Sequence, residues 1–411
     1  MKINKKIIFL ILSFVAYLLL STLIEPNLRF SYDYLIPWYA ALYIVKGVPL
    51  YEQPMFKEIN GEIIRYPYHL PIYIYFLAVL IFILGESFIA GKISLVIFIF
   101  CDALLLEHIL KNAQKNNEEK NKILGYSSLI FLLNPVIIIT TISGLFDGLP
   151  LLYLLTGIFF LQKINEDKNK RNLIFSILSG ISIGIGFLTK VIPLIFLPVG
   201  FLWLLSKKKY LETISFSLSC LGTSGGFLAY LWLTYEDFKS LGLGWQVTRE
   251  DKSFSFYYYV FNLEFRPGLI LLGVGLGVIS ILIIYFLVKN EKLDFIIISG
   301  IFLTSFFIFY RVFYPHYLIW IVPFISYLGI IFINTKKMKM FYVLVGVFLI
   351  ELFSIGVYYV DFFKWIILGK SLLITVSSIN LICLVFFLVL FFINRKRGFS
   401  TPAQSIIVST D

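Results

Sequence analysis

Apolar stretches about as long as a bilayer is thick follow one another along almost the whole chain. Its mean hydropathy is +0.89, and of its 411 residues 59% are hydrophobic and only 14% are charged. A helix needs roughly 20 apolar residues to cross the hydrocarbon core, and a water-soluble domain has no use for many such segments. We therefore predict an all-α, polytopic integral membrane protein with about 12–13 transmembrane helices.

The first predicted span, Ile7–Ile24, follows three lysines near the amino terminus. It is similar to a secretion signal, but no small-residue cleavage site follows it, so we expect a retained helix. Further spans are expected, from the run of apolar residues between polar breaks, near residues 88–110, 123–142, 147–162, 173–189, 191–205, 213–234, 268–288, 295–310, 317–334, 341–360 and 371–393.

Positive charge gathers in the short connections between these spans. By the positive-inside rule, these connections and both termini belong in the cytoplasm. The longer connections 25–69 and 235–267 are nearly neutral and rich in aromatic residues, so we expect them outside. The net charge of +11 is thus explained by membrane topology and does not indicate nucleic-acid binding. The basic connections are the amino terminus and residues 111–122, 163–171, 207–209, 289–292, 336–339 and 395–397.

One apolar segment, Leu70–Leu84, does not fit this alternation. If both it and 88–110 crossed the membrane, the basic connection that starts at Lys111 would lie outside. A segment of about 15 residues is more typical of re-entrant or interfacial helices than of full spans. We therefore expect that Leu70–Leu84 does not fully cross.

Domain organisation is simple. The three cysteines, Cys101, Cys220 and Cys383, lie in apolar spans and offer neither a disulfide framework nor metal-ligand spacing. No soluble domain or internal repeat is evident. We expect one membrane domain over residues 1–397, followed by a short polar cytoplasmic tail over 398–411.

The first outer connection carries a carboxylate, Asp33, just after the first span. The segment Tyr34–Val45 places aromatic and aliphatic side chains on one helical stripe, which predicts a short amphipathic helix along the membrane surface. A carboxylate at that surface suits a catalyst that acts on a lipid-borne substrate. Alternatively, Asp33 only caps the helix that follows it.

Polar residues recur at other outer span ends. Arg65 and His69 lie between aromatics and prolines, where they could bind an anion or anchor the chain at the interface. Asp147 lies between Gly144 and Gly148 in a sharp turn, where it could serve a ligand or only the turn itself.

Three further cationic or titratable residues favour anion binding. Lys190 lies between two apolar runs with no polar loop around it, and an ammonium there is costly unless it is paired or reaches the surface. Arg311 and His316 lie together at a later outer span end. The guanidinium fork of arginine donates two hydrogen bonds at once, which suits phosphate.

Four short motifs follow one another in order on the predicted outer side: Asp33 with its tyrosine-rich helix and the Gly47–Tyr51 turn, Tyr66–Pro67, Asn134–Pro135 followed by Asp147 between two glycines, and Lys190 before Pro193. Together they resemble the membrane glycosyltransferases of the C-type fold that use polyprenol-phosphate sugars. The branch that they resemble includes the prokaryotic polyprenol-phosphate-mannose-dependent mannosyltransferases. The resemblance covers the first half of the chain well and Arg311–His316 more loosely.

The resemblance implies an inverting transfer, by a mannosyltransferase of the cell envelope, from a polyprenyl-phosphate donor to a hydroxyl of a lipid, glycan or protein at the outer face. Asp33 would be the catalytic base. Lys190, Arg65, Arg311 and His316 would hold the donor phosphate, and Asp147, His69 and Tyr34 would bind the acceptor or support the site. The paired-acid metal motif of the oligosaccharyltransferase branch is absent, because no second acid lies beside Asp147. We expect no cofactor.

Two functions of other classes also fit the sequence. One is a transporter or flippase for a lipid or small anion, in which membrane-embedded cations mark the pathway. Transporters more often carry such charges deep within spans and in paired halves. The other is a non-catalytic membrane subunit of an envelope assembly, in which Asp33 is only a helix cap.

Overall fold

The computed structural model describes most of the chain, and the account below concerns those residues alone. They are 5–23, 32–52, 56–59, 62–65, 70–112, 124, 126–164, 170–236, 238, 265–288, 294–310, 315–364 and 370–395.

Helices make up nearly all of this structure, which confirms the predicted fold class of a polytopic, all-α membrane protein. Six helices are long and apolar enough to cross a membrane, and six shorter apolar helices accompany them within the described residues. A two-stranded antiparallel hairpin, which the sequence analysis did not predict, pairs β1 (Phe56–Ile59) with β2 (Glu62–Arg65). The six lie in α1 (Lys5–Leu23), α4 (Phe88–Asn112), α9 (Lys170–Thr189), α11 (Tyr210–Thr234), α14 (Phe265–Val288) and α18 (Lys370–Asn394). Helix α17 (Met338–Lys364) is also long.

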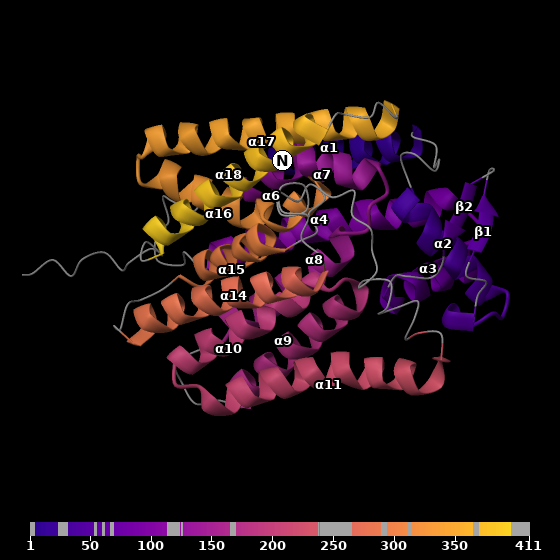
Figure 1. The fold of residues 1–411 in the computed structure, drawn as a ribbon, viewed down its shortest axis with the longest axis horizontal. Helices are drawn as coiled ribbons and strands as arrows, with labels where there is room; N and C mark the ends of the chain where they lie inside the picture. Colours follow the sequence, from indigo (N-terminus) through magenta and orange to yellow (C-terminus); the bar gives the residue numbers. More distant parts are fainter. Residues whose placement is uncertain are drawn as a thin grey trace, which may run out of the picture.

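The remaining helices are short. The α-helices among them are α2 (Tyr32–Val45), α3 (Pro71–Leu84), α6 (Ser127–Leu132), α7 (Pro135–Ile142), α8 (Gly148–Gln162), α10 (Phe196–Ser206), α15 (Phe295–Phe309) and α16 (Val322–Asn334). The 3-10 helices are η1 (Leu50–Glu52), η2 (Ile192–Ile195) and η4 (Pro315–Trp320). In Figure 1 the long helices lie side by side along the horizontal axis, and α2, α3 and the β1–β2 hairpin gather at the right-hand end.

Helices α1 and α4 run in opposite directions against each other. Lys6, near the start of α1, binds Glu107 near the end of α4, whereas the ammonium of Lys92, near the start of α4, donates to the carbonyl of Ser21, near the end of α1, at 3.2 Å. The chain between α1 and α4 therefore leaves and returns at the same end of the bundle, so α2 and α3 together add an even number of crossings. This parity is the one expected if Leu70–Leu84 does not cross, a prediction that the pairing of α1 with α4 does not test by itself.

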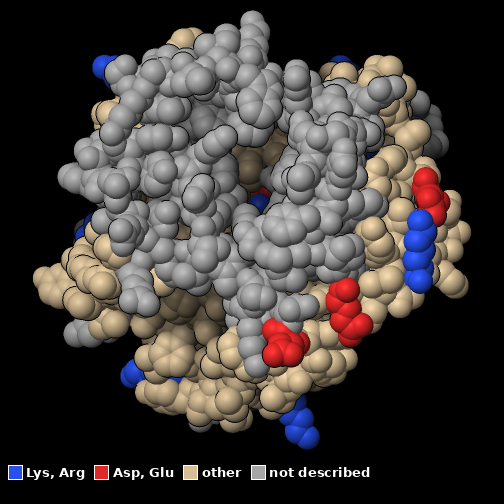
Figure 2. Space-filling model, turned by 45° about the vertical axis from the view of Figure 1, so that its right-hand side comes forward, with Lys and Arg blue, Asp and Glu red and all other residues tan. Residues whose placement is uncertain are grey.

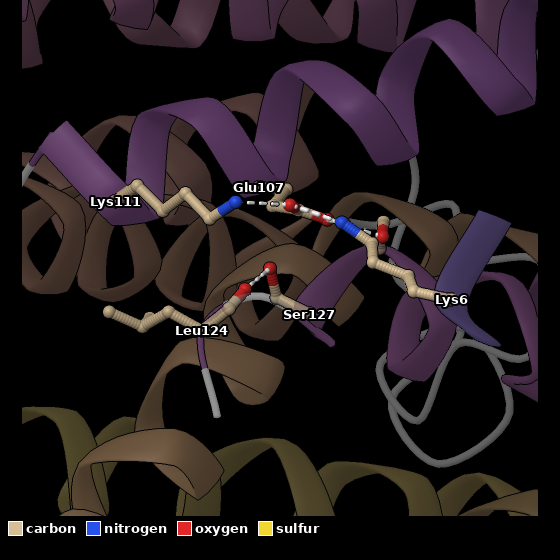
Figure 3. Close-up of polar contacts among 6 residues, drawn as sticks. Lys6, Glu107, Lys111, Leu124 and Ser127 are labelled. Atoms are coloured by element: carbon tan, nitrogen blue, oxygen red, sulfur yellow. Dashed lines mark hydrogen bonds and ion pairs between the residues drawn. The ribbon is translucent and has the colours of Figure 1, made fainter. Parts of the chain in front are cut away.

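Four side chains form a cluster at the other end of these helices, which we call the basic end because Lys6 and Lys111 lie there (Figure 3). Glu107 accepts hydrogen bonds at both oxygens: from Lys6, from Lys111 at 2.6 Å and from Ser128 at 2.5 Å. The Glu107 cluster thus joins α1, α4 and α6. Beside it, the hydroxyl of Ser127 donates to the carbonyl of Leu124 at 2.8 Å.

Three predicted spans are not single α-helices. The span expected at 123–142 is divided into α6 and α7 at Asn134–Pro135, where the Asn134 side chain accepts a hydrogen bond from the backbone N–H of Val136. Proline is well suited to the first position of the new helix because its missing N–H would be unpaired there anyway. The spans expected at 191–205 and 317–334 begin with the 3-10 helices η2 and η4 before α10 and α16 follow.

Glycines set the close packing of α9. A Cβ atom added at Gly180 would lie 2.3 Å from the carbonyl oxygen of Phe216, and one added at Gly184 would lie 2.9 Å from that of Cys220, so α9 approaches the backbone of α11 closely. Small residues allow such contacts between membrane helices, where dispersion forces replace the hydrophobic drive available in water. Because α9 carries Lys190 just beyond its last residue, this packing fixes the height of that lysine.

Candidate functional site

Asp147 and Lys190 form a buried ion pair. The Lys190 Nζ lies 2.6 Å from Asp147 Oδ1, and 18% of the lysine side chain is exposed against 1% of the aspartate side chain. The two residues are 43 positions apart in the sequence. The structure thus joins two of the residues that the sequence singled out.

Two more side chains approach the Asp147 carboxylate. The indole N–H of Trp320 donates to Oδ1 at 2.9 Å, and the Nε2 of His316 lies 3.8 Å from Oδ2. This second distance is longer than a hydrogen bond. We call Asp147, Lys190, His316 and Trp320 the Asp147 cluster.

Aromatic rings enclose the lysine. The Lys190 Nζ lies 5.3 Å from the ring centroid of Phe146 and 4.7 Å from that of Tyr317, within the range of a cation–π interaction. The ring of Tyr73, in α3, stacks on that of Phe146, with centroids 4.5 Å apart and planes 12° apart. The ammonium therefore has one carboxylate and two ring faces around it.

Local backbone geometry explains how Asp147 reaches the lysine. Gly144 has a φ of 79°, which turns the chain sharply after α7 and is strained for other residues. Asp147 then precedes α8, but its side chain makes no capping hydrogen bond to that helix. The carboxylate is directed at Lys190 instead, so a simple turn or cap does not account for this residue.

The short helices place the cluster below the membrane surface. Helix α8 has 15 residues, about 22 Å at 1.5 Å per residue, whereas the hydrocarbon core is about 30 Å thick. It ends beside the basic end of α4, where the rings of Phe159 and His108 are 5.3 Å apart, so its Asp147 end stops roughly 8 Å short of the opposite surface. Figure 2 views the molecule from this side, and acidic and basic side chains of described residues lie along its right-hand and lower edges.

Tyr34 connects the first outer segment to this site. It is fully buried, and its hydroxyl donates to the carbonyl of Phe88 at 2.6 Å. A Cβ added at Gly144 would lie 3.0 Å from the Cβ of Tyr34, and one added at Gly91 would overlap the Tyr34 hydroxyl at 2.2 Å. The start of α2 is therefore held against the turn that leads to Asp147.

Asp33 precedes Tyr34 and lies in the first turn of α2, since the helix begins at Tyr32. Its side chain lies outside the described part of the structure. The predicted amphipathic helix is present as α2, but it packs more deeply than a surface helix would, because Ile36 and Ala40, which are off the predicted stripe, are buried together with Trp38.

The other candidate residues are placed less fully. Arg65 is the last residue of β2, and its side chain is not described. His69 and Arg311 lie outside the described residues. Of the predicted site residues, the structure thus brings together Asp147, Lys190 and His316, with Tyr34 at the adjoining turn.

Sequence reasoning missed two residues at this site. Trp320 follows His316 by four positions, and its indole is fully buried against Asp147. Asp102, inside α4, is also fully buried, and neither of its oxygens has a hydrogen-bond partner among the described residues; its Oδ2 lies 3.6 Å from where a Cβ of Gly148 would be. A carboxylate inside an apolar span was the available signal for Asp102.

No three His, Cys, Asp or Glu side chains gather as candidate metal ligands in the part of the chain that the structure describes. The site that the geometry does offer is a lysine beside a carboxylate, a histidine and an indole.

Comparison with known proteins identifies the fold. No protein-family model matches the chain, and no curated protein matches it in sequence. Among solved structures, it is similar to ArnT from Cupriavidus metallidurans, crystallised with undecaprenyl phosphate bound, with a TM-score of 0.54 and 11% sequence identity over 95% of this chain and 77% of that one. At this identity the likeness is one of fold, and the chain has the C-type glycosyltransferase fold of an integral membrane protein.

Proposed function

We propose that this protein is an inverting glycosyltransferase that moves a sugar from a polyprenyl-phosphate donor to a hydroxyl acceptor on a lipid, glycan or protein. Mannose is the sugar to test first, because the sequence motifs resemble mannosyltransferases. The active site would face outside, with both termini in the cytoplasm. The fold shared with ArnT, which was crystallised with undecaprenyl phosphate, supports a polyprenyl-phosphate ligand.

The observation that carries this proposal is the position of Lys190. Its ammonium lies near the rings of Phe146 and Tyr317. It pairs with Asp147, which precedes α8, a helix of 15 residues that is too short to cross the hydrocarbon core alone. A polyprenyl chain lies in the hydrocarbon core, so its phosphate is held at the boundary between that core and the headgroups. A partly exposed lysine there can meet the phosphate without drawing the lipid into water.

The chemistry requires a base on one face of the sugar and positive charge on the other. The acceptor oxygen would attack C1, the C1–O bond to phosphate would break, and Asp33 would take the hydroxyl proton. The phosphate would leave as an anion, stabilised by Lys190 and His316, with Arg65 and Arg311 as further ligands. Asp147, Tyr34 and His69 would orient the acceptor or support these groups. A single displacement inverts C1, as in inverting glycosidases.

A transfer assay tests the proposal directly. Purified protein in detergent is incubated with radiolabelled polyprenyl-phosphate-mannose and a total lipid extract, and transfer of label is followed by chromatography. The matched control is Lys111→Ala, which removes a lysine bound to a carboxylate in the Glu107 cluster. We expect transfer by the wild type and by this control, and loss of transfer in Asp33→Asn. Neither transfer nor hydrolysis with any polyprenyl-phosphate sugar would contradict the proposal.

The alternative function, transport, can be tested with the same protein. Single cysteines at positions 33, 190 and 311 are labelled from either side of sealed vesicles with a membrane-impermeant thiol reagent. The enzyme requires access from the outer side alone. Access that changes sides when ligand is added would favour transport.

A further inference from the structure

We propose that the Asp147 carboxylate pairs with the Lys190 ammonium until the donor arrives, and that the donor phosphate then displaces it. Donor binding is thus an exchange of one anion for another. This inference rests on the proposed function, because it assigns a state of the same site before donor arrives. It goes beyond that function in predicting that the carboxylate opposes donor binding rather than assisting it.

Exposure gives the direction of the exchange. The Lys190 side chain is partly exposed, whereas Asp147 is almost fully buried behind it. A ligand that reaches the pair from outside therefore meets the ammonium first. One side of that ammonium is occupied by Asp147 Oδ1 at 2.6 Å, so a phosphate oxygen competes for the same positive charge.

Lys190 keeps its place without Asp147. The rings of Phe146 and Tyr317 lie within cation–π range of its Nζ, and Phe146 is in turn stacked on Tyr73. The backbone N–H of Lys190 donates to the carbonyl of Gly186 at 2.9 Å, so the residue continues from the last turn of α9. The lysine can therefore change its anion without losing its position.

Asp147 also keeps a partner after the exchange. The Trp320 indole donates to the same Oδ1 at 2.9 Å. The Nε2 of His316 lies 3.8 Å from Oδ2 and could close that distance when protonated. The carboxylate is thus not left bare in a buried site, which would be costly. Both members of the ion pair have second partners, and this is what makes exchange feasible.

The exchange has a purpose that follows from membrane energetics. A lone ammonium within the bilayer is expensive, and the pair with Asp147 compensates the charge while the site is empty. The arriving phosphate then takes over that compensation. The carboxylate that remains nearby repels the phosphate and weakens the complex, which favours release of polyprenyl phosphate after transfer.

The sign of one mutational effect tests this. Wild-type protein, Asp147→Asn and Lys190→Met are each titrated with undecaprenyl phosphate in nanodiscs, with undecaprenol as the uncharged control, and binding is read by native mass spectrometry. We expect Asp147→Asn to bind undecaprenyl phosphate about tenfold more tightly than the wild type, since one competing charge-assisted hydrogen bond is removed. Lys190→Met should bind it about ten- to a hundredfold more weakly than the wild type, and adding Asp147→Asn to Lys190→Met should not restore binding.

Equal or weaker binding by Asp147→Asn, when the wild type does bind, would show that Asp147 merely positions the lysine and would overturn the exchange. A wild type that does not distinguish undecaprenyl phosphate from undecaprenol would instead contradict the proposed function. Inorganic phosphate is then added as a competitor, to separate a site for the phosphate headgroup from a site for the lipid chain. Exchange at Lys190 requires that inorganic phosphate compete with undecaprenyl phosphate.

Trp320→Phe provides a second variant should Asp147→Asn fail to fold. It removes the donor that satisfies the carboxylate after exchange, so undecaprenyl phosphate should bind severalfold more weakly while the Asp147–Lys190 pair itself is kept. Binding equal to the wild type would count against the exchange. Thermal unfolding of each variant with and without lipid reports the folded fraction, because a ligand stabilises the state that binds it.

Discussion

Two buried carboxylates among the described residues bind lysine, and they do so in different ways. Glu107 accepts hydrogen bonds at both oxygens, from Lys6, Lys111 and Ser128, across three helices. Asp147 directs one oxygen to Lys190 and Trp320, and its second oxygen lies 3.8 Å from His316, beyond a hydrogen bond. Each Glu107 oxygen thus has a short hydrogen bond, whereas the described contact of Asp147 Oδ2 is the longer one to His316.

The difference indicates how a membrane protein separates structural from functional charge. A saturated cluster resists change, because losing any donor leaves a polar group unpaired. A cluster in which the lysine also contacts ring faces and the carboxylate also binds an indole can reorganise around a ligand. On this basis we assign the Glu107 cluster to the contact between α1, α4 and α6, and we propose that the Asp147 cluster binds substrate.

A third carboxylate, that of Asp33, is predicted to act in catalysis, and its replacement should have the largest effect on transfer. Asp33→Asn keeps the shape and much of the hydrogen bonding but cannot accept a proton, so transfer should fall about 10²–10⁴-fold while undecaprenyl phosphate still binds. Transfer rate at saturating donor, measured beside lipid binding, checks this. If Asp33 only stabilises the start of α2, asparagine should serve nearly as well, and near-normal turnover would assign the chemistry to another residue.

Replacing Lys190 separates the two clusters by function. Lys190→Ala should raise the donor concentration required by about ten- to a hundredfold, since a charge-assisted contact contributes about 1.5–3 kcal/mol; Arg311→Ala should act in the same direction. Transfer is measured at limiting donor, with Lys111→Ala as control. Full activity would remove either residue from the phosphate site. If Lys190→Ala protein fails to accumulate, and adding Asp147→Asn restores accumulation, then Lys190 is a structural ion-pair partner instead.

Glu107→Gln should lower stability and leave transfer unchanged, the reverse of the result expected for Lys190→Ala. It removes the charge that Lys6 and Lys111 share, and we expect the free energy of unfolding to fall by about 1–3 kcal/mol, a range reduced because both lysines are partly exposed. Thermal unfolding in detergent measures this, with transfer per folded molecule unchanged. A drop in turnover at constant stability would show that the two clusters are coupled.

The smallest effect is expected for Lys111. Its side chain is 45% exposed, and it is four residues from Glu107 on the same helix, a geometry that contributes about 0.3–0.5 kcal/mol. Lys111→Ala should therefore unfold within a degree or two of the wild type, a shift in keeping with that energy. Lys6→Ala should cost more, because Lys6 joins α1 to α4 and is less exposed. Equal losses would mean that Glu107 is not the link between the helices.

Much of the fold follows from the order of apolar segments, because each span must satisfy its own backbone in lipid. The interruption at Asn134–Pro135 was also visible, since proline and a capping side chain act locally. The 3-10 starts of η2 and η4 and the β1–β2 hairpin were not, because they depend on packing by distant segments. The same limit applies to the buried start of α2.

The site could be predicted only in parts. Asp147, Lys190 and His316 each had a local signal: an acid between glycines, a lysine in an apolar run, and a histidine at a span end. Their meeting depends on how α8, α9 and η4 pack, which no short motif encodes. Trp320 gave no separate signal, because tryptophan at a span end is common in membrane proteins whatever its role.

The attachment of α1 has a consequence for biogenesis. This helix is mostly lipid-facing, and the polar contacts that tie it to α4 reach residues 71 and 101 positions further along the chain. At about 5–20 residues per second, a ribosome needs roughly 5–20 s to make the segment between Lys6 and Glu107. During that interval the first helix is already in the bilayer without the partner that later fixes it, and conditions that slow elongation lengthen its exposure to quality-control proteases.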